Sequence, residues 1–458
     1  MMLSRRSLLA GLAAMPPALA LAQGRPPAKP AVPARRVLGA AGLPGTVAFA
    51  LLDPNGALAD AALAGAPMMP ASTLKAVTAL YALSRLGAGH RFRTRIIRSG
   101  DTLVLVGGGD PVLSTDDLAR LAGDLAATGQ PAPARFAVWG GALPQVAEIA
   151  PDQADHLAYN PALSGMILNF NRVHLGWRQA GGAVQMSLEA RGAAHSPRAY
   201  TITAAPGNQD DLFSYRSDMD HESWTIARSA LARPGSRWLP VRKPELYAGD
   251  VFQTLCRAKG LVLPTPEVIA GLPQGQVMAS HSSPPLDDIL RGMLRFSTNL
   301  TAEVVGLHAS GARDPAGSAR AMQAWLGTQG QGTDFILADH SGLSSDSRVT
   351  AQGMARLLAG PGLAAGLPDL LKPDPLDDDL GKGATEPGAV RAKTGTLNFV
   401  SNLAGYVRGA DGVSRAFSIL CADAPRQTAT AGQELPPGVL TWTRDAKRLQ
   451  RDILNGWT

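Results

Sequence analysis

The sequence predicts an α/β (α+β) protein with an antiparallel sheet flanked by helices and with a large, mostly β, inserted region. Strand-like runs occur at both ends of the chain, and helical stretches with apolar faces lie between them. A long segment rich in strand and turn signals separates two of these helices. With 458 residues, the chain is long enough for about three domains.

The N-terminal part of the predicted sheet is a hairpin. Residues Thr46–Leu52 and residues 57–63 alternate in polarity around Pro54-Asn55-Gly56, which is a typical turn sequence. The chain then enters a helix that begins near Ser72, is apolar on most sides and ends at Gly87. A helix that is apolar all round is expected at the centre of a domain.

Three strands and a helix are predicted at the C-terminal end. The strands are residues 388–399, 403–407 and 415–422, and a Gly-Ala-Asp-Gly turn precedes the third. A helix follows from about Leu440, and its predicted apolar face comprises Trp442, Ala446, Leu449 and Ile453. We expect the hairpin and these three strands to form one antiparallel sheet, built from both ends of the chain.

Three short motifs carry residues suited to acyl transfer. Ser72-Thr73-Leu74-Lys75 places a hydroxyl and an amine one helical turn apart, so the Lys75 amine can act on the proton of Ser72. Ser297-Thr298-Asn299 lies between two helical stretches, and Lys393-Thr394-Gly395-Thr396 lies in a strand-like run. Taken singly, each is better explained as a helix cap or an edge-strand lysine. All three in this order are hard to assign to chance.

A long insertion separates the first two motifs. Ser297 follows Ser72 by 225 residues, far more than a connecting loop needs. We place the inserted region at residues 92–276, between the two parts of a split catalytic domain at 37–91 and 277–458. Its predicted elements are strands around 93–106, a helix from about 114 to 128, and strand-like pieces at 166–170 and 184–188.

The motifs, their order and the long insertion resemble the low-molecular-mass class C penicillin-binding proteins, the D-alanyl-D-alanine carboxypeptidase/endopeptidase family. The resemblance covers most of the chain and extends to Pro70-Ala71-Ser72-Thr73, Gly108-Gly109-Asp110-Pro111, Leu168-Asn169-Phe170-Asn171, Ser341-Gly342-Leu343-Ser344 and Ala404-Gly405-Tyr406. It implies a serine β-lactamase/penicillin-binding-protein-like catalytic domain and a Ser72 acyl-enzyme. The implied substrates are peptidoglycan stem peptides, and the implied inhibitors are β-lactams.

Peptide cleavage through a serine needs a nucleophile, a base, a proton donor and an oxyanion site. Ser72 is the predicted nucleophile, and Lys75 is its base if burial and a second cation lower the ammonium pKa. Ser297 is expected to relay a proton to the departing D-Ala, while Asn299 holds Lys75 and the substrate amide. The resemblance implies that the backbone N–H groups of Ser72 and Thr396 are the oxyanion donors.

The third motif is the predicted substrate-binding strand. Lys393, with Thr394 and Thr396, is expected to neutralise the free carboxylate of the substrate. Gly395 has no side chain, which would let the substrate backbone approach the strand closely. No metal or organic cofactor is required. The alternatives are a β-lactamase or esterase of the same fold, and a non-catalytic cell-wall-binding module.

Three departures from the family pattern are visible. Thr298 stands where relatives usually have Asp, and we expect little effect because its neighbours carry the reactive groups. His340 stands where glycine is common. The stretch before the third motif is acidic, which puts the rim of the cleft in question; its acids are Asp374, Asp377, Asp378 and Asp379.

Other candidate sites are weaker. Asp339-His340-Ser341 contains triad residues, but adjacent residues rarely converge on one point, so His340 is expected to be structural. His221-Glu222-Ser223-Trp224-Thr225 lacks the second histidine of a zinc-protease motif. Cys256 and Cys421 are expected to be buried free thiols, with no zinc site.

The N-terminus predicts export. Residues 1–22 have a basic start, an apolar stretch and a small-x-small end at Ala22, which indicates a signal peptide cleaved near that residue. Ser4-Arg5-Arg6-Ser7-Leu8-Leu9 fits either a twin-arginine signal or an ordinary secretory start. Residues 23–36 are rich in proline and are predicted to be a flexible arm. The mature protein is expected in the periplasm or otherwise outside the cytoplasm, without a transmembrane segment.

Charge argues against nucleic-acid binding. The formal net charge is +6, and six basic residues precede the first acid, Asp53, so the remainder of the chain is neutral. The basic balance therefore belongs to the targeting segment and the arm rather than to a binding surface.

Overall fold

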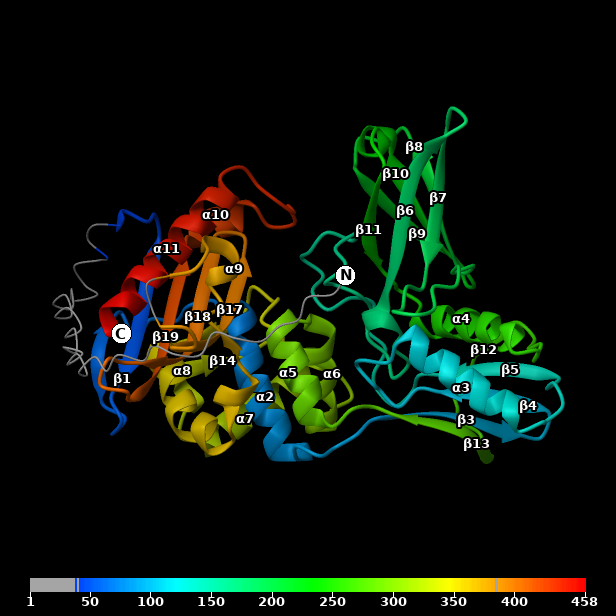
Figure 1. Ribbon diagram of the computed structural model, residues 1–458, viewed down its shortest axis with the longest axis horizontal. Helices are drawn as coiled ribbons and strands as arrows, with labels where there is room; N and C mark the ends of the chain where they lie inside the picture. The colour runs from blue at the N-terminus through cyan, green and yellow to red at the C-terminus, as the bar shows by residue number, and fades with distance from the viewer. Residues whose placement is uncertain (1–37, 39–40, 384–385) are drawn as a thin grey trace, which may run out of the picture.

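The computed structural model describes residue 38, residues 41–383 and residues 386–458 (Figure 1). The predicted signal peptide (1–22) and arm (23–36) lie outside the described residues. Within the described part, no helix combines the length and the apolar character needed to span a membrane.

One six-stranded sheet unites the two ends of the chain. Its order is β16 (Lys372–Pro373), β17 (Val390–Leu397), β18 (Val400–Arg408), β19 (Ser414–Ala422), β1 (Thr46–Leu52) and β2 (Leu58–Ala62), with every neighbouring pair antiparallel. Pairing of β1 with β19 joins the N-terminal hairpin to the C-terminal strands. The predicted hairpin, the three strands and their common sheet are confirmed.

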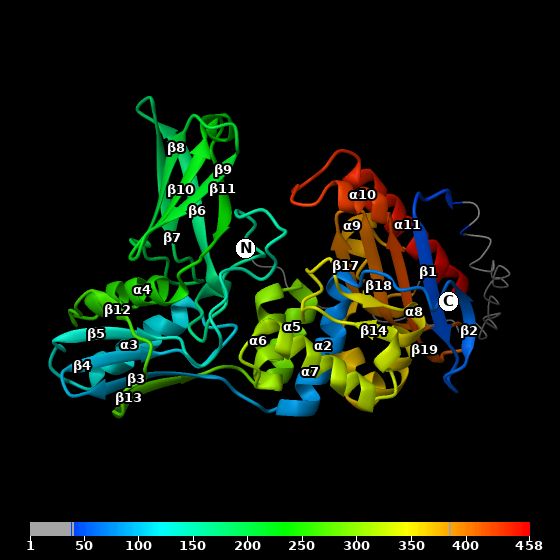
Figure 2. The ribbon, with the colours of Figure 1, turned by 180° about the vertical axis from the view of Figure 1, so that it is seen from behind.

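Helices cover both faces of this sheet (Figures 1 and 2). On one face, α11 (Val439–Trp457) buries its predicted apolar residues against Phe49, Leu403 and Phe417 of the strands. On the other face, α2 (Leu74–Leu86) and α8 (Ala351–Leu357) share a core with β1, β18 and β19. Every residue of α2 from Leu74 to Ala82 is buried, which confirms the predicted central helix.

Three more helices surround α2 on the side away from the sheet. They are α5 (Leu286–Phe296), α6 (Asn299–Ser310) and α7 (Pro315–Thr328). Shorter elements complete this half of the molecule: the 3₁₀ turn η1 (Ala71–Thr73), β14 (Phe335–Ile336), β15 (Arg348–Val349), α9 (Asp377–Leu380) and α10 (Ala424–Ala429).

The inserted region forms a second lobe beside the first (Figures 1 and 2). Its largest sheet has the order β12 (Pro266–Val268), β5 (Arg135–Trp139), β4 (Thr102–Val106), β3 (Arg93–Ser99) and β13 (Gln276–Ser282). It shares a core with α3 (Thr115–Ala127) and α4 (Pro244–Ala258). β13 starts at the predicted end of the inserted region and pairs with β3 near its predicted start.

Two three-stranded sheets stand on this base. One has the order β11 (Gly235–Pro240), β6 (Arg172–Ala180) and β7 (Ala183–Glu189), and the other has β8 (Ile202–Gly207), β10 (Glu222–Ala227) and β9 (Phe213–Ser217). The predicted strands at 93–106 and 184–188 and the predicted helix at 114–128 are confirmed.

The predicted strand at 166–170 is wrong. Asn169, Phe170 and Asn171 have φ angles of +50°, +59° and +50°, which ends any extended run. Asparagine tolerates this left-handed conformation because its short side chain bonds to nearby backbone. Here Asn171 Nδ2 donates to Ala162 O at 2.9 Å, and Asn169 Oδ1 accepts from Thr115 N at 3.0 Å. The apolar residues before them are buried, so apolarity alone suggested a strand.

Candidate active site

Ser72 lies in the turn η1, directly before α2. Ala71 has a φ of +45°, a strained value for a residue with a side chain that is of order 1–3 kcal/mol unfavourable. The turn is held by Thr73 Oγ1, which donates to Pro70 O at 2.6 Å, and by Asn402 Nδ2, which donates to Met69 O and Pro70 O at 2.8 Å each. Strand β18, which carries Asn402, thus fixes the turn that presents the serine.

Lys75 is the centre of a three-point contact. Its Nζ lies 2.9 Å from Ser72 Oγ, 2.7 Å from Asn299 Oδ1 and 2.7 Å from the backbone oxygen of Ser341. The whole side chain is buried. The structure therefore brings the first predicted motif and the end of the second to one nitrogen atom.

Lys393 and Ser297 form the second half of the site. Lys393 Nζ donates to Ser297 Oγ at 3.0 Å and to Thr394 O at 2.7 Å. Ser297 directly follows α5 and has a φ of +59°. This left-handed conformation ends α5 before α6 begins at Asn299. The reactive residues of the three motifs thus form two hydrogen-bonded groups, Lys75 with Ser72 and Asn299 and Lys393 with Ser297. Both groups meet at one cleft, although the two lysines lie more than 300 positions apart in the sequence.

Burial depresses the pKa of both amines. The pKa of Lys75 falls to about 7 because burial disfavours its charge, against the opposing effect of Asp339 and Glu303. The pKa of Lys393 lies well below its ordinary value because of burial, and the charges of Lys75 and Lys372 lower it further. An amine with a pKa near 7 is about half neutral at pH 7, and the neutral form is the one that can act as a base.

Two buried acids, Asp339 and Glu303, act on Lys75 by raising its pKa. The sequence motifs did not indicate this role for either of them. Glu303 Oε1 accepts from Ser341 N at 2.8 Å and from His340 N at 3.1 Å. Asp339 accepts from Ser344 N at 2.9 Å and from the hydroxyls of Ser341 and Ser347. Burial and the charge of Asp339 raise the pKa of Glu303. A lone acid on the apolar helix α6, four positions after Asn299, was the sequence signal for Glu303.

Gly395 allows β17 to lie against the serine turn. A methyl group built on it would come within 2.9 Å of Pro70 O and Thr73 N and 3.0 Å of Ser72 N. The glycine therefore makes room for η1. Its role in letting a substrate backbone approach the strand stays a prediction. Gly342 is equally constrained, with a φ of +74° and a would-be methyl 1.9 Å from Ala71 O.

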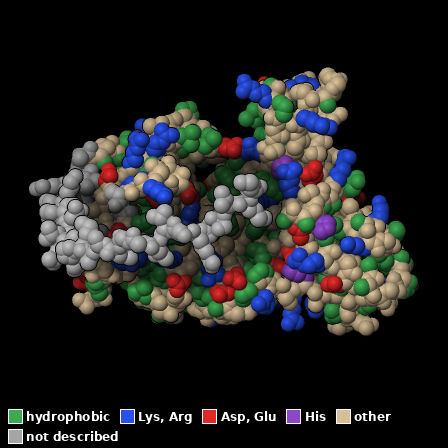
Figure 3. Space-filling view, viewed as in Figure 1, with side chains coloured by type: hydrophobic (Ala, Val, Ile, Leu, Met, Phe, Trp, Pro, Cys, Tyr) green, Lys and Arg blue, Asp and Glu red, His purple; other side chains and the backbone are tan. Residues whose placement is uncertain are grey.

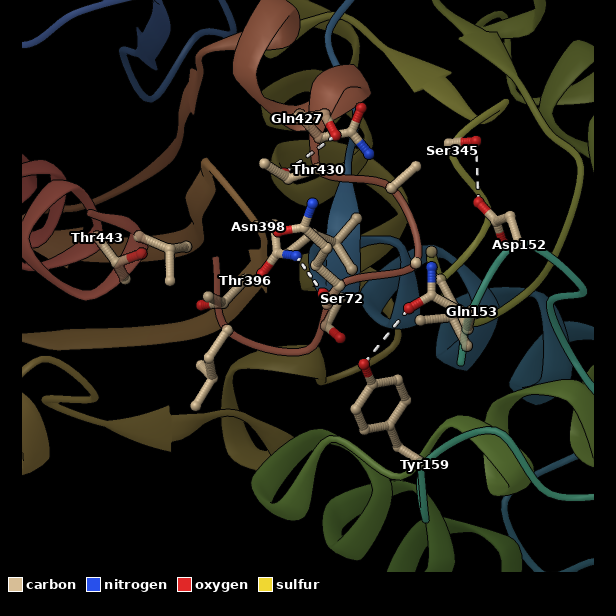
Figure 4. A pocket seen from close by; sticks show the side chains of 18 of the residues that line it. Ser72, Asp152, Gln153, Tyr159, Ser345, Thr396, Asn398, Gln427, Thr430 and Thr443 are labelled. Atoms are coloured by element: carbon tan, nitrogen blue, oxygen red, sulfur yellow. Dashed lines mark hydrogen bonds between the residues drawn. The ribbon is translucent and has the colours of Figure 1, made fainter. Parts of the chain in front are cut away.

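A cleft of about 450 Å³ opens above Ser72 (Figure 4). Ser72, Ser297, Asn299 and Thr396 line it. The inserted region contributes further lining residues from one loop, namely Asp152, Gln153 and Tyr159. This loop also supports the site, because the backbone oxygen of Tyr159 accepts from Asn299 Nδ2 at 3.0 Å. Figure 3 shows the hollow between the two lobes in which hydrophobic side chains gather.

Thr298 and His340 lie away from the chemistry. Thr298 lines a different groove, on the α5 side of the second motif, and not the cleft above Ser72. His340 is buried and its Nε2 lies 2.7 Å from Ser318 Oγ, while Ser341 Oγ bonds to Asp339. The three adjacent residues therefore form no Ser-His-Asp relay, in agreement with the structural role predicted for His340.

The acidic stretch before the third motif docks on α11 and does not form the rim of the cleft. Asp377 pairs with Arg451 at 2.8 Å and Asp379 pairs with Lys447 at 2.7 Å. Asp374 accepts from Gly388 N at 2.5 Å, and Asp378 pairs with Lys372. None of the four acids is among the residues that line the cleft.

The family model of the D-Ala-D-Ala carboxypeptidase 3 (S13) family matches residues 51–435. The chain belongs to this family. It is 30% identical over 397 residues to a D-alanyl-D-alanine carboxypeptidase from Actinomadura sp. (strain R39), covering 78% of this chain and 73% of that one. It is also 29% identical over 230 residues to the D-alanyl-D-alanine carboxypeptidase DacB from Haemophilus influenzae, covering 46% and 47% of the two chains.

Two solved structures illustrate the shared fold. Penicillin binding protein 4 from Haemophilus influenzae matches with a TM-score of 0.72 at 18% identity, covering 92% of this chain and 99% of that one. A predatory peptidoglycan endopeptidase from Bdellovibrio bacteriovorus matches with a TM-score of 0.51 at 15% identity, covering 89% and 92%. The predicted family, fold class and enzyme class, a serine-type D-Ala-D-Ala carboxypeptidase, are confirmed.

The remaining residue predictions concern cysteine and metal. Cys256 and Cys421 are buried and free, as predicted. Among the described residues, no group of three or more His, Cys, Asp and Glu side chains is arranged to hold a metal ion.

Proposed function

We propose that this S13-family protein cleaves peptidoglycan stem peptides, as a carboxypeptidase, an endopeptidase or both, through an acyl-enzyme on Ser72. The observation that carries the proposal is the contact of Lys75 Nζ with Ser72 Oγ and Asn299 Oδ1, beside Lys393 on Ser297, at the base of one cleft. Residues 37–91 and 277–458 would be the split catalytic domain, and residues 92–276 the inserted one.

In the acylation step, neutral Lys75 takes the proton of Ser72. A neutral amine has two hydrogens and one lone pair, and the three contacts of Lys75 suit this state. The hydrogens point to Asn299 Oδ1 and Ser341 O, and the lone pair faces Ser72 Oγ. The serine oxygen then attacks the scissile carbonyl, and the backbone N–H groups of Ser72 and Thr396 stabilise the resulting oxyanion.

Collapse of the tetrahedral intermediate breaks the peptide bond. Ser297, which lies between the cleft and Lys393, would relay to the departing amine the proton that Lys75 took from Ser72, so that Lys75 is neutral again. Lys393 and the hydroxyls of Thr394 and Thr396 would hold the carboxylate of the leaving residue. A bound carboxylate would raise the pKa of Lys393 from its depressed value and restore the positive charge.

Water then attacks the acyl-enzyme: neutral Lys75 takes a proton from this water and gives it to Ser72 Oγ as the ester bond breaks, which releases the peptide acid and restores both residues. A β-lactam carries both a reactive amide and a nearby carboxylate, so it would acylate Ser72 by the same steps. Penicillin binding protein 4 from Haemophilus influenzae has been crystallised with a β-lactam, which supports peptidoglycan peptides and β-lactams as the ligands of this chain.

We further propose that the protein acts outside the cytoplasm, in the periplasm or an equivalent compartment. The family acts on the cell wall, and residues 1–22 have the pattern of a signal peptide cleaved near Ala22. Cleavage can be checked by N-terminal sequencing of the protein isolated from the exporting cell, where a chain beginning near Gln23 is expected.

A two-substrate experiment tests the reaction. The mature protein and Ser72→Ala are incubated separately with a labelled penicillin and with a muropeptide ending in D-Ala-D-Ala. The proposal expects stable label on Ser72 and release of D-Ala, both lost in Ser72→Ala. Fast penicillin turnover without release of D-Ala would indicate a β-lactamase, and absence of any labelling would exclude every acyl-serine mechanism.

A further inference from the structure

A loop of the C-terminal half crosses the cleft toward the inserted region. This loop, residues 430–438 between α10 and α11, is called the strap below (Figure 1). The strap residues that line the cleft are Thr430, Ala431, Gly432, Gln433 and Leu435. The strap is attached beside the binding strand at Gln433, because Asn398 Nδ2 donates to Gln433 O at 2.7 Å.

The inserted region holds the middle of the strap through Glu434. Its Oε2 lies 3.1 Å from His156 Nε2, and its Oε1 accepts from Arg237 Nη2 at 2.9 Å. We call these three side chains the clamp. His156 and Arg237 are 16% and 25% exposed, so their end of the clamp is largely shielded from water. In Figure 3, acidic and basic side chains meet where the two lobes touch above the hollow.

Contacts within the inserted region orient both basic partners of Glu434. The ring of His156 stacks on the ring of Phe213 with 4.8 Å between centroids, and the Arg237 guanidinium lies 4.7 Å from the same ring. An exposed ion pair contributes little when two mobile side chains must be ordered, but here one side is already ordered. Burial opposes ionisation of Glu434, yet the contacts with His156 and Arg237 keep its pKa below the ordinary value.

The strap covers the acyl half of a bound peptide, and this step rests on the proposed function. If the carboxylate of the leaving residue lies at Lys393 and the scissile carbonyl lies at Ser72, the acyl half must extend in the opposite direction. It then passes Thr396 and reaches Asn398, where the strap is attached. Any side chain of the acyl half that carries a second peptide would have to pass the strap.

We infer that the clamp determines substrate class: Glu434 holds the strap to the inserted region, so the cleft accepts an unbranched acyl peptide and disfavours one whose side chain is joined to a second peptide. The members of the clamp contact each other and not the reacting atoms, so they are positioning residues. This assigns the inserted region a part in selecting the substrate, in addition to its support of Asn299.

The test compares two peptides on the full mature chain. The linear peptide is acetylated lysyl-D-Ala-D-Ala, and the branched one carries a tripeptide on the lysine side-chain amine. Glu434→Gln should raise the ratio of kcat/KM for the branched peptide to that for the linear peptide by about fivefold or more, with the linear value changed less than about twofold. Arg237→Gln should act in the same direction, and the double variant should add little.

A matched control removes another ion pair of the inserted region. Glu267→Gln breaks the exposed pair with Arg135, at 2.5 Å, which touches neither the cleft nor the strap. The branched-to-linear ratio should not change in this variant. Equal ratios in wild type and Glu434→Gln, with normal cleavage of the linear peptide, would overturn the inference while leaving the proposed function intact.

A second measurement does not depend on activity. Hydrogen–deuterium exchange of the strap amides should be faster in Glu434→Gln than in wild type and Glu267→Gln. Equal exchange would show that Glu434 does not hold the strap and would overturn the inference by itself. Failure of the wild type to release D-Ala from the linear peptide, with faster strap exchange in Glu434→Gln, would count against the proposed function and leave the clamp standing.

Discussion

The protonation state of Lys75 should control how fast Ser72 is acylated. Burial lowers the pKa of Lys75 from 10.5 to about 7. At pH 7.5 an ordinary lysine is about 0.1% neutral, whereas an amine with a pKa near 7 is about 75% neutral. The site therefore raises the neutral fraction by roughly 700-fold, and the fall in pKa from 10.5 to about 7 corresponds to about 5 kcal/mol of net destabilisation of the ammonium form. Lys75→Ala should slow acylation by about 10²–10⁴-fold, the usual contribution of a general base.

Stopped-flow labelling with a fluorescent penicillin measures this directly. Below pH 7 the acylation rate constant should fall about tenfold per pH unit, because the base must be neutral, and it should level off above pH 7. The charge of Asp339 raises the pKa of Lys75, so Asp339→Asn should move the acidic limb to lower pH. The reasoning is refuted if Lys75→Ala acylates within a few fold of wild type, or if the limb in Asp339→Asn moves to higher pH.

Three further predictions concern the supports of the site. Lys393→Gln should lower kcat/KM by about 10²-fold for a peptide with a free C-terminal carboxylate and by clearly less for the corresponding C-terminal amide, and equal losses for both would contradict carboxylate binding. Gly342→Ala should lower the free energy of unfolding by about 2 kcal/mol or more, because its methyl would meet Ala71 O at 1.9 Å; an unchanged Tm would contradict this. Asn402→Ala removes two hydrogen bonds to the backbone before Ser72, so urea denaturation should show a loss of about 1–3 kcal/mol and acylation should slow; full activity would contradict its role in fixing the turn.

Local patterns predicted most of the fold. The hairpin at Thr46–Leu52 was recognisable because alternation and a Pro-Asn-Gly turn act over a few residues. The apolar face of α11 was recognisable because helical periodicity places every third or fourth residue on one side. The segment at 166–170 failed because left-handed asparagines interrupt an apolar run without changing its composition.

In the candidate site, too, the sequence predicted the local contacts and missed the long-range ones. Ser72 and Lys75 are one helical turn apart, so their contact follows from the helix alone. Glu303, Asn402 and the backbone oxygen of Ser341 act on that pair from distant parts of the chain, and no local pattern marks those contacts. The contact of Gly395 with the serine turn is also invisible to local patterns, since that turn lies more than 300 residues earlier.

By itself, the sequence determined the family, the three motifs, the split of one sheet between the two chain ends and the presence of a large inserted region. These depend on short-range periodicity, turn chemistry and motif order. Only the tertiary structure decided that Lys75 is buried enough to lose its charge near neutral pH, that Tyr159 of the inserted region supports Asn299, and that Glu434 spans the cleft. Each of these depends on burial or on contacts between segments far apart in the chain, and such contacts exist only in the folded protein.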